Sequence, residues 1–113
     1  MIPSTVRIFV CMEPQDMRRS FDGLALAARQ SLGEDPRSGA MFVFTNRRGR
    51  QLRVLWWEAG GYSLLCRRLH QALFQLPKPG DPSDRSVVID RHGLGELIRG
   101  VPTTRKRAIP IPS

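Results

Sequence analysis

The 113-residue chain is poor in the residues that build metal sites and disulfide frameworks. It has two cysteines and two histidines, and no C-x-x-C pair occurs. A zinc site needs three or four ligands at workable spacing, whereas His70 and His92 stand far apart in the sequence. We therefore expect no metal site and no cofactor. Cys11 and Cys66 lie among apolar residues and are expected to be buried, reduced thiols.

Long hydrophobic runs are also missing. The apolar run at residues 8–12 (IFVCM) is too short for a secretory signal and follows no basic segment. The other apolar stretches fall far short of a membrane span. The sequence thus predicts a cytoplasmic protein without a membrane partner.

The chain lacks the motifs of common enzyme sites. It contains no nucleophile elbow, no phosphate-binding glycine loop and no zinc-protease helix. Glu58, Asp90 and Glu96 fall on separate predicted elements, while Asp16 and Asp22 suit helix capping and pairing with neighbouring arginines. Since catalysis needs a constellation of groups, we predict no catalytic residues and no enzyme activity.

Acidic side chains are scarce in the second part of the chain. Residues 1–46 hold five basic and five acidic side chains, whereas residues 47–113 hold thirteen basic and five acidic ones. The whole formal net charge of +8 therefore lies after residue 46. Such asymmetry favours a polyanionic partner such as DNA, and the alternative is a basic surface without a partner.

What is present predicts an α+β fold. Residues 5–12 form an expected strand with apolar residues on both faces, which favours a central place in its sheet. Apolar positions at a 3.6-residue period predict a helix over residues 16–32, with Asp16 as N-cap, Gly33 as stop, and Gly23 inside the helix at a close approach to a strand. Further strands are expected over residues 41–45, 51–58 and 86–89.

Residues 62–69 fit either a strand or a helix. A strand is favoured because a Gly-Gly turn after the preceding strand is typical of a meander. Residues 70–76 then predict a helical turn stopped by Pro77, and residues 78–85 a linker. Asp90 should cap a short helix that Gly100 ends.

The expected architecture is a small antiparallel β-sheet, or meander, with one main helix packed on a face and a short C-terminal helix. Residues 1–102 would form a single domain. Residues 103–113, which contain Arg105-Lys106-Arg107, would form a flexible basic tail.

An arginine-rich hairpin tip at residues 46–50 (NRRGR) is the leading candidate site. Gly49 suits a turn position with positive φ, and guanidinium groups bind phosphates through forked donors. The adjacent strands carry further arginines that would extend the patch along one side. The candidate nucleic-acid-binding residues are Arg47, Arg48, Arg50, Arg53, Arg67 and Arg68.

The two tryptophans follow this hairpin directly. Because side chains alternate along a strand, only one of them faces the core, and we expect Trp56 to do so with Leu52 and Val54. Trp57 would share a face with Arg53 and is the candidate for a partner surface. It could alternatively stack on bases or pack beneath a loop or helix.

These features together resemble the accessory proteins called TnpB of insertion sequences of family 66, which are distinct from the RNA-guided nucleases of the same name. The resemblance spans about residues 5–78. It rests on residues 16–24 (DMRRSFDGL), Gly39, residues 41–44 (MFVF), 46–48 (NRR), 55–57 (LWW), 61–62 (GY), Leu64, 67–69 (RRL), Phe74 and Pro77. The chain departs from the family at His70, Ala72 and Leu76.

The resemblance implies a non-catalytic protein encoded beside a separate, larger transposase and needed for transposition. It supplies no catalytic residue. The leading hypothesis is an accessory factor that binds DNA through the arginine hairpin. The alternative is a protein–protein adaptor that contacts the transposase of the same element and binds little DNA. The sequence leaves the oligomeric state and the DNA site open.

Overall fold

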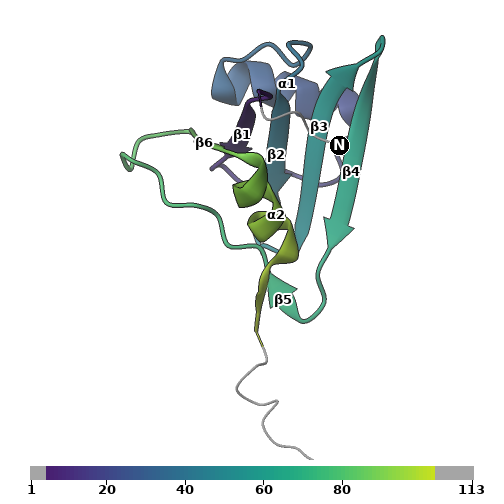
Figure 1. The fold of residues 1–113 in the computed structure, drawn as a ribbon. Coiled ribbons are helices and arrows are strands. Elements are labelled where there is room, and N and C mark those ends of the chain that lie inside the picture. Colours follow the sequence, from purple (N-terminus) through teal and green to yellow (C-terminus); the bar gives the residue numbers. More distant parts are fainter. Residues whose placement is uncertain (1–4, 104–113) are drawn as a thin grey trace, which may run out of the picture.

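The computed structural model describes residues 5–103, which form seven strands and two helices (Figure 1). The strands are β1 Ile8–Cys11, β2 Met41–Thr45, β3 Gln51–Glu58, β4 Gly61–Arg68, β5 Ala72–Leu73, β6 Ser86–Ile89 and β7 Val101–Pro102. The helices are α1 Phe21–Leu32 and α2 Arg91–Arg99. The α+β class, the main helix and the short C-terminal helix are confirmed.

Five strands form one mostly antiparallel sheet in the order β4-β3-β2-β1-β6. The meander from β2 through β4 is confirmed, and β1 runs parallel to β2 and antiparallel to β6. All four residues of β1 are buried, as its two-faced apolar pattern predicted. β4 and β6 are the edges of the sheet.

Each face of the sheet is covered by a helix. Leu24 and Ala28 of α1 pack on one face with Phe42 and Phe44 of β2. Leu94 and Leu97 of α2 pack on the other face with strand residues that include Val43. Figure 1 shows the two helices on opposite sides of the sheet, which explains why its central strands are apolar on both faces.

Helix α1 begins later than the sequence predicted. Asp16 does not cap it, because the Asp16 carboxylate accepts a hydrogen bond from the Arg18 main-chain N–H (2.9 Å) in a turn that precedes the helix. Ser20 occupies the N-cap position instead, without a side-chain cap bond. Gly33 ends the helix at φ 67°, as predicted, and its N–H donates to Arg29 O.

Gly23 therefore lies in the first turn of α1 rather than in the middle of the helix. The three atoms nearest to a Cβ at this position would all belong to the Arg19 side chain, the first being Arg19 Cβ at 2.9 Å. The closest approach at Gly23 is thus to Arg19, whereas the sequence predicts a strand there.

The segment after β4 also differs from its prediction. Residues 61–68 are the strand that the Gly-Gly turn favoured, but residues 70–76 do not form a helical turn. Their main chain is bound by distant segments: β5 pairs with β7, and Phe74 N–H donates to Gly49 O (2.8 Å). Long-range pairing thus outweighs the local helical pattern.

The short helix α2 is confirmed, and so is its cap. The Asp90 side chain accepts a hydrogen bond from the Gly93 main-chain N–H (2.7 Å).

The two cysteines have different environments. Cys11 is fully buried in β1, and burial raises the pKa of its thiol. Cys66 is exposed, so its expected burial is wrong. Its strand is an edge of the sheet, and its cross-strand neighbour is Arg53 rather than an apolar side chain.

Neither helix found between residues 5 and 103 has the length and apolar character required to cross a lipid bilayer. The basic tail expected at residues 103–113 lies outside the described residues apart from Thr103.

Candidate nucleic-acid interface

Asn46 and Gly49 close the hairpin tip between β2 and β3. Asn46 Oδ1 accepts hydrogen bonds from the main-chain N–H groups of Arg50 (2.9 Å) and Gln51 (3.0 Å). Gly49 adopts φ 73°, which favours glycine, and its N–H donates to Asn46 O. This geometry leaves Arg47 and Arg48 exposed at the tip.

The tip does not project freely from the sheet. Gly49 O accepts from Phe74 N–H (2.8 Å), and Arg50 O accepts from Leu69 N–H (2.8 Å). The Arg50 guanidinium donates to His70 O at 3.0 Å. The segment that follows β4 therefore holds the hairpin tip in place, and Arg50 contributes to that attachment.

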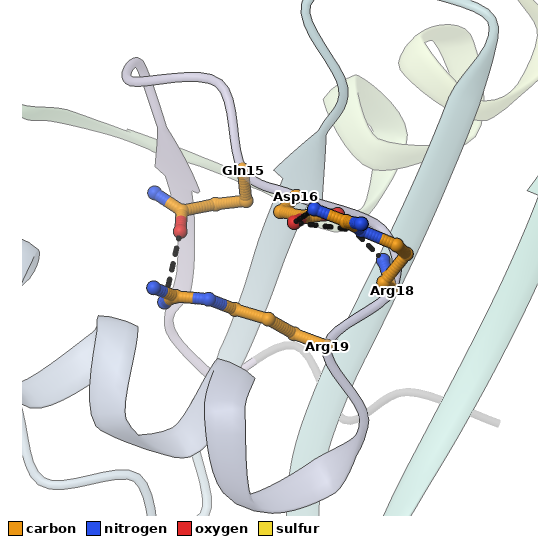
Figure 2. Close-up of polar contacts among 4 residues, drawn as sticks. All are labelled: Gln15, Asp16, Arg18 and Arg19. Carbon is orange, nitrogen blue, oxygen red and sulfur yellow. Dashed lines mark hydrogen bonds and ion pairs between the residues drawn. The ribbon is translucent and has the colours of Figure 1, made fainter.

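The loop before α1 lies beside the hairpin. Gln15 N–H donates to Thr45 O at the end of β2 (2.9 Å), which fixes the start of this loop to the sheet. Figure 2 shows the Arg18 guanidinium lying against the Asp16 carboxylate, with Nη2 2.8 Å from Oδ2. The hydrogen bonds from Arg18 lower the pKa of Asp16 to about 2. Gln15 and Arg19 point toward each other in the same view.

A surface depression of about 430 Å³ separates this loop from the hairpin tip. Arg18 lines it on the loop side, and Arg47 and Arg48 line it on the hairpin side. All three arginines are exposed. Within residues 5–103, neither Arg47 nor Arg48 makes a hydrogen bond or an ion pair. The remaining lining residues are Gln15, Asp16, Met17, Asn46 and Gln51. We call this feature the basic depression.

The other candidate arginines do not all lie on one face of the sheet. The register of β3 and β4 places Arg53 and Arg68 on the face that α1 covers and Arg67 on the opposite face. Arg53 donates to Arg19 O (2.6 Å), and Arg67 donates to Ile98 O (2.7 Å). The expected patch along one side is therefore wrong, because side chains of neighbouring positions on a strand alternate between faces.

The tryptophans face as the alternation predicted. Trp56 packs against the core beneath α2, on the side of Leu52 and Val54, and is half-buried. Trp57 lies on the other face, where Arg37 stacks over its ring at 4.6 Å. The Tyr62 ring meets the Trp57 ring edge-on, with 4.9 Å between the ring centroids. Trp57 is therefore also half-buried.

Residues 15–18 form a part of the depression that the sequence did not predict. The sequence predicts that Arg18 pairs with an aspartate on a helix, whereas the pair lies on the loop before α1 and Arg18 lines the basic depression. The arginine pair inside the DMRRSFDG run was the available signal. Within the described ranges, no three His, Cys, Asp or Glu side chains gather as metal ligands would.

Comparison with known proteins places this geometry in a biological setting. Residues 6–108 match the family described as IS66 Orf2 like protein. The chain belongs to the IS66 Orf2-like family. The family supports an accessory role in transposition of an insertion sequence, and its members are generally not catalytic.

Two relatives come from Sinorhizobium fredii (strain NBRC 101917 / NGR234). The uncharacterized protein y4hO is 37% identical over 103 residues, which cover 89% of this chain and 87% of y4hO. The uncharacterized protein y4jC is 29% identical over 106 residues, which cover 94% of this chain and 88% of y4jC. No solved structure matches the chain.

Proposed function

We propose that the protein is a non-catalytic accessory factor of transposition that binds DNA at the basic depression. The observation that carries the proposal is the convergence of Arg18, Arg47 and Arg48 on one surface feature. They come from two segments that are about thirty residues apart in the sequence. Main-chain hydrogen bonds hold both segments to the sheet, so the arginines are brought together before any ligand binds.

The chemistry of this depression suits a phosphate backbone. Exposed guanidinium groups donate forked, charge-assisted hydrogen bonds to phosphate oxygens. Such contacts position a protein on DNA without reading its sequence. We therefore expect binding to duplex DNA of micromolar affinity and little sequence preference.

The six arginines expected from the sequence divide into three groups in this proposal. Arg47 and Arg48 contact phosphates directly. Three others donate hydrogen bonds from their guanidinium groups to main-chain carbonyl oxygens: Arg50, Arg53 and Arg67. They therefore support the surface more than they contact DNA. Arg68 lies opposite Gln51, which lines the depression, and extends the basic surface from there.

A second candidate function is the adaptor that contacts the transposase of the same element. A largely apolar cavity beside β4 favours it, as does the half-buried Trp57. An adaptor would bind the transposase with little affinity for DNA alone. The two functions therefore predict opposite results for the purified protein and duplex DNA.

The test is DNA binding over a salt series with two charge-matched variants. Contact with about four to six phosphates predicts a slope of log affinity against log salt of about −4 to −5. Arg47→Gln/Arg48→Gln should weaken binding about tenfold and reduce the magnitude of the slope by about two. Arg29→Gln/Arg99→Gln removes the same charge at exposed sites on α1 and α2 and should have little effect. A wild-type affinity that does not depend on salt would favour the adaptor.

A further inference from the structure

Strand β4 is a long edge with main-chain groups available for pairing. It has eight residues and no neighbour beyond β3 in the sheet. A two-residue turn joins the strands and pairs Glu58 with Gly61. Hydrogen-bonded and non-hydrogen-bonded residue pairs alternate along the two strands from that position. Every second residue of β4 therefore points its main-chain N–H and C=O away from β3. These outward residues are Tyr62, Leu64, Cys66 and Arg68.

An apolar cavity of about 480 Å³ adjoins this edge on the side of α2. Leu65 of β4 lines it and is 40% exposed. Trp56 of β3 forms another wall, and Leu94 and Ile98 of α2 close the far side. A strand added beside β4 would place every second side chain on this face. The side chain opposite Leu65 would then lie at the mouth of the cavity.

The edge also carries positive charge at one end. Arg67 lies two residues from Leu65 on the same face, and Arg68 lies on the opposite face. Both are exposed. Arg67 donates through Nε to Ile98 O, which fixes its guanidinium and leaves its terminal nitrogens for a carboxylate. A second copy of this chain would add a net charge of +8 beside the first, so an acidic partner is the better complement.

We propose that β4 and its adjoining cavity receive an extended segment of another protein, which adds to the sheet as an antiparallel strand. An acidic residue of this segment lies opposite Arg67, and a large apolar residue two positions later lies opposite Leu65. Main-chain hydrogen bonds give affinity in this mode, and the cavity and the arginine give specificity. The surface is separate from Arg47 and Arg48, so it does not depend on DNA binding.

The probe is a fluorescent peptide of sequence Thr-Glu-Thr-Leu-Thr-Ile-Thr. Its alternation puts the glutamate and both apolar residues on one face when it is extended. A control peptide of the same composition has adjacent glutamate and leucine, which fall on opposite faces. Since the two peptides have equal charge, attraction to a basic protein alone cannot distinguish them.

Three variants test the edge, its charge and the fold. Cys66→Pro removes one outward N–H and leaves the bonds to β3, which is a position where edge strands tolerate proline. Cys66→Ser keeps the N–H and is the matched control. Arg67→Glu reverses the charge that the peptide glutamate meets. Thermal melting of each variant shows whether the fold is intact. DNA binding of the two Cys66 variants, which keep the net charge, shows whether the basic depression is intact.

The proposal expects the alternating peptide to bind the full chain at least tenfold more tightly than its control. Cys66→Pro should lower that affinity at least tenfold, and Cys66→Ser should not change it. Arg67→Glu should abolish binding of the alternating peptide and should bind the version of that peptide in which lysine replaces glutamate. This result tests the proposal even if the proline variant does not fold. Equal binding of the alternating and control peptides to the wild-type protein would overturn the proposal. No binding of the alternating peptide at a concentration of about 1 mM would overturn it as well. Self-association of the chain that Cys66→Pro abolishes would also overturn it, because a second copy would then occupy the edge.

Discussion

At the scale of single residues, an arginine's contacts decide its role more than its position in a basic run. Arg47 and Arg48 are exposed beside the depression, whereas the next arginine, Arg50, donates to His70 O. The sequence predicted all three as phosphate contacts because it shows charge and spacing only. Which of them binds a carbonyl depends on the segment after β4, whose course comes from long-range pairing.

Asp16 places one negative charge within the basic depression. It holds Arg18 in a forked ion pair, and both side chains are accessible to water. We predict that Asp16→Asn raises affinity for duplex DNA about two- to fivefold, because it removes a repulsive charge and releases Arg18. Fluorescence anisotropy at one fixed salt concentration measures this. Unchanged or weaker binding would show that Asp16 lies away from the DNA path.

The same ion pair predicts a pH dependence of stability. The pKa of Asp16 is lowered from 3.8 to about 2 in the folded protein, so its ionised form stabilises the fold. This contribution is complete above about pH 4 and is lost as the pH falls through 2. The melting temperatures of wild type and Asp16→Asn should therefore differ by a constant amount from pH 5 to 8 and converge toward pH 2. A difference that changes around pH 7 would contradict this assignment.

At the scale of elements, alternation along strands was predictable and their end contacts were not. The period-two pattern placed Trp56 on the core side with Leu52 and Val54, and the Gly-Gly turn selected β4 as a strand. The start of α1 was missed because Asp16 satisfies a local turn before the helix begins. The helical turn predicted after β4 is absent because the main chain there pairs with β7, about thirty residues later.

Two glycines near the C-terminal end of the described chain should respond oppositely to alanine. Gly100 ends α2 at φ 79°, and a Cβ there would lie 2.5 Å from Leu69 Cδ1 and 3.2 Å from Leu73 O. Gly100→Ala should therefore destabilise the fold by about 2–4 kcal/mol. Gly95 lies inside α2 with nothing within 4 Å of such a Cβ, so Gly95→Ala should stabilise by about 0.5–1 kcal/mol. Urea unfolding measures both, and equal effects would contradict this account of the α2–β7 connection.

At the scale of the whole molecule, the charge asymmetry was visible in the sequence, but the basic depression was not. Half of the depression comes from residues 15–18, where basic and acidic side chains balance along the chain. The fold brings Arg18 next to Arg47 and Arg48 through the bond between Gln15 and Thr45. The distribution of charge along the sequence predicts a basic surface formed by the second part of the chain alone.

The acidic side chains between residues 5 and 103 are dispersed over the fold. No three potential metal ligands cluster between residues 5 and 103, and two-metal cleavage of DNA needs clustered carboxylates. We predict that the purified protein leaves supercoiled plasmid intact in the presence of magnesium or manganese, as gel electrophoresis would show. Cleavage that survives rigorous purification and disappears on replacement of one Asp or Glu would establish an enzyme instead.

The last prediction compares the hairpin tip with the C-terminal segment as sources of DNA affinity. Residues 104–113 carry Arg105, Lys106 and Arg107, one more positive charge than Arg47 and Arg48 together. If affinity followed charge alone, deleting this segment would cost more than Arg47→Gln/Arg48→Gln. The hairpin tip, however, is held by its bonds to Asn46 and Phe74, so its contacts lose little chain entropy on binding.

We therefore predict that the double substitution weakens DNA binding more than the deletion, although it removes fewer charges. Affinities at one salt concentration test this, and melting temperatures confirm that both proteins fold. The deletion should reduce the salt slope without abolishing binding. If the deletion abolishes binding while the double variant binds normally, the basic depression is not the DNA site, and its arginines would be better explained as a surface for the transposase.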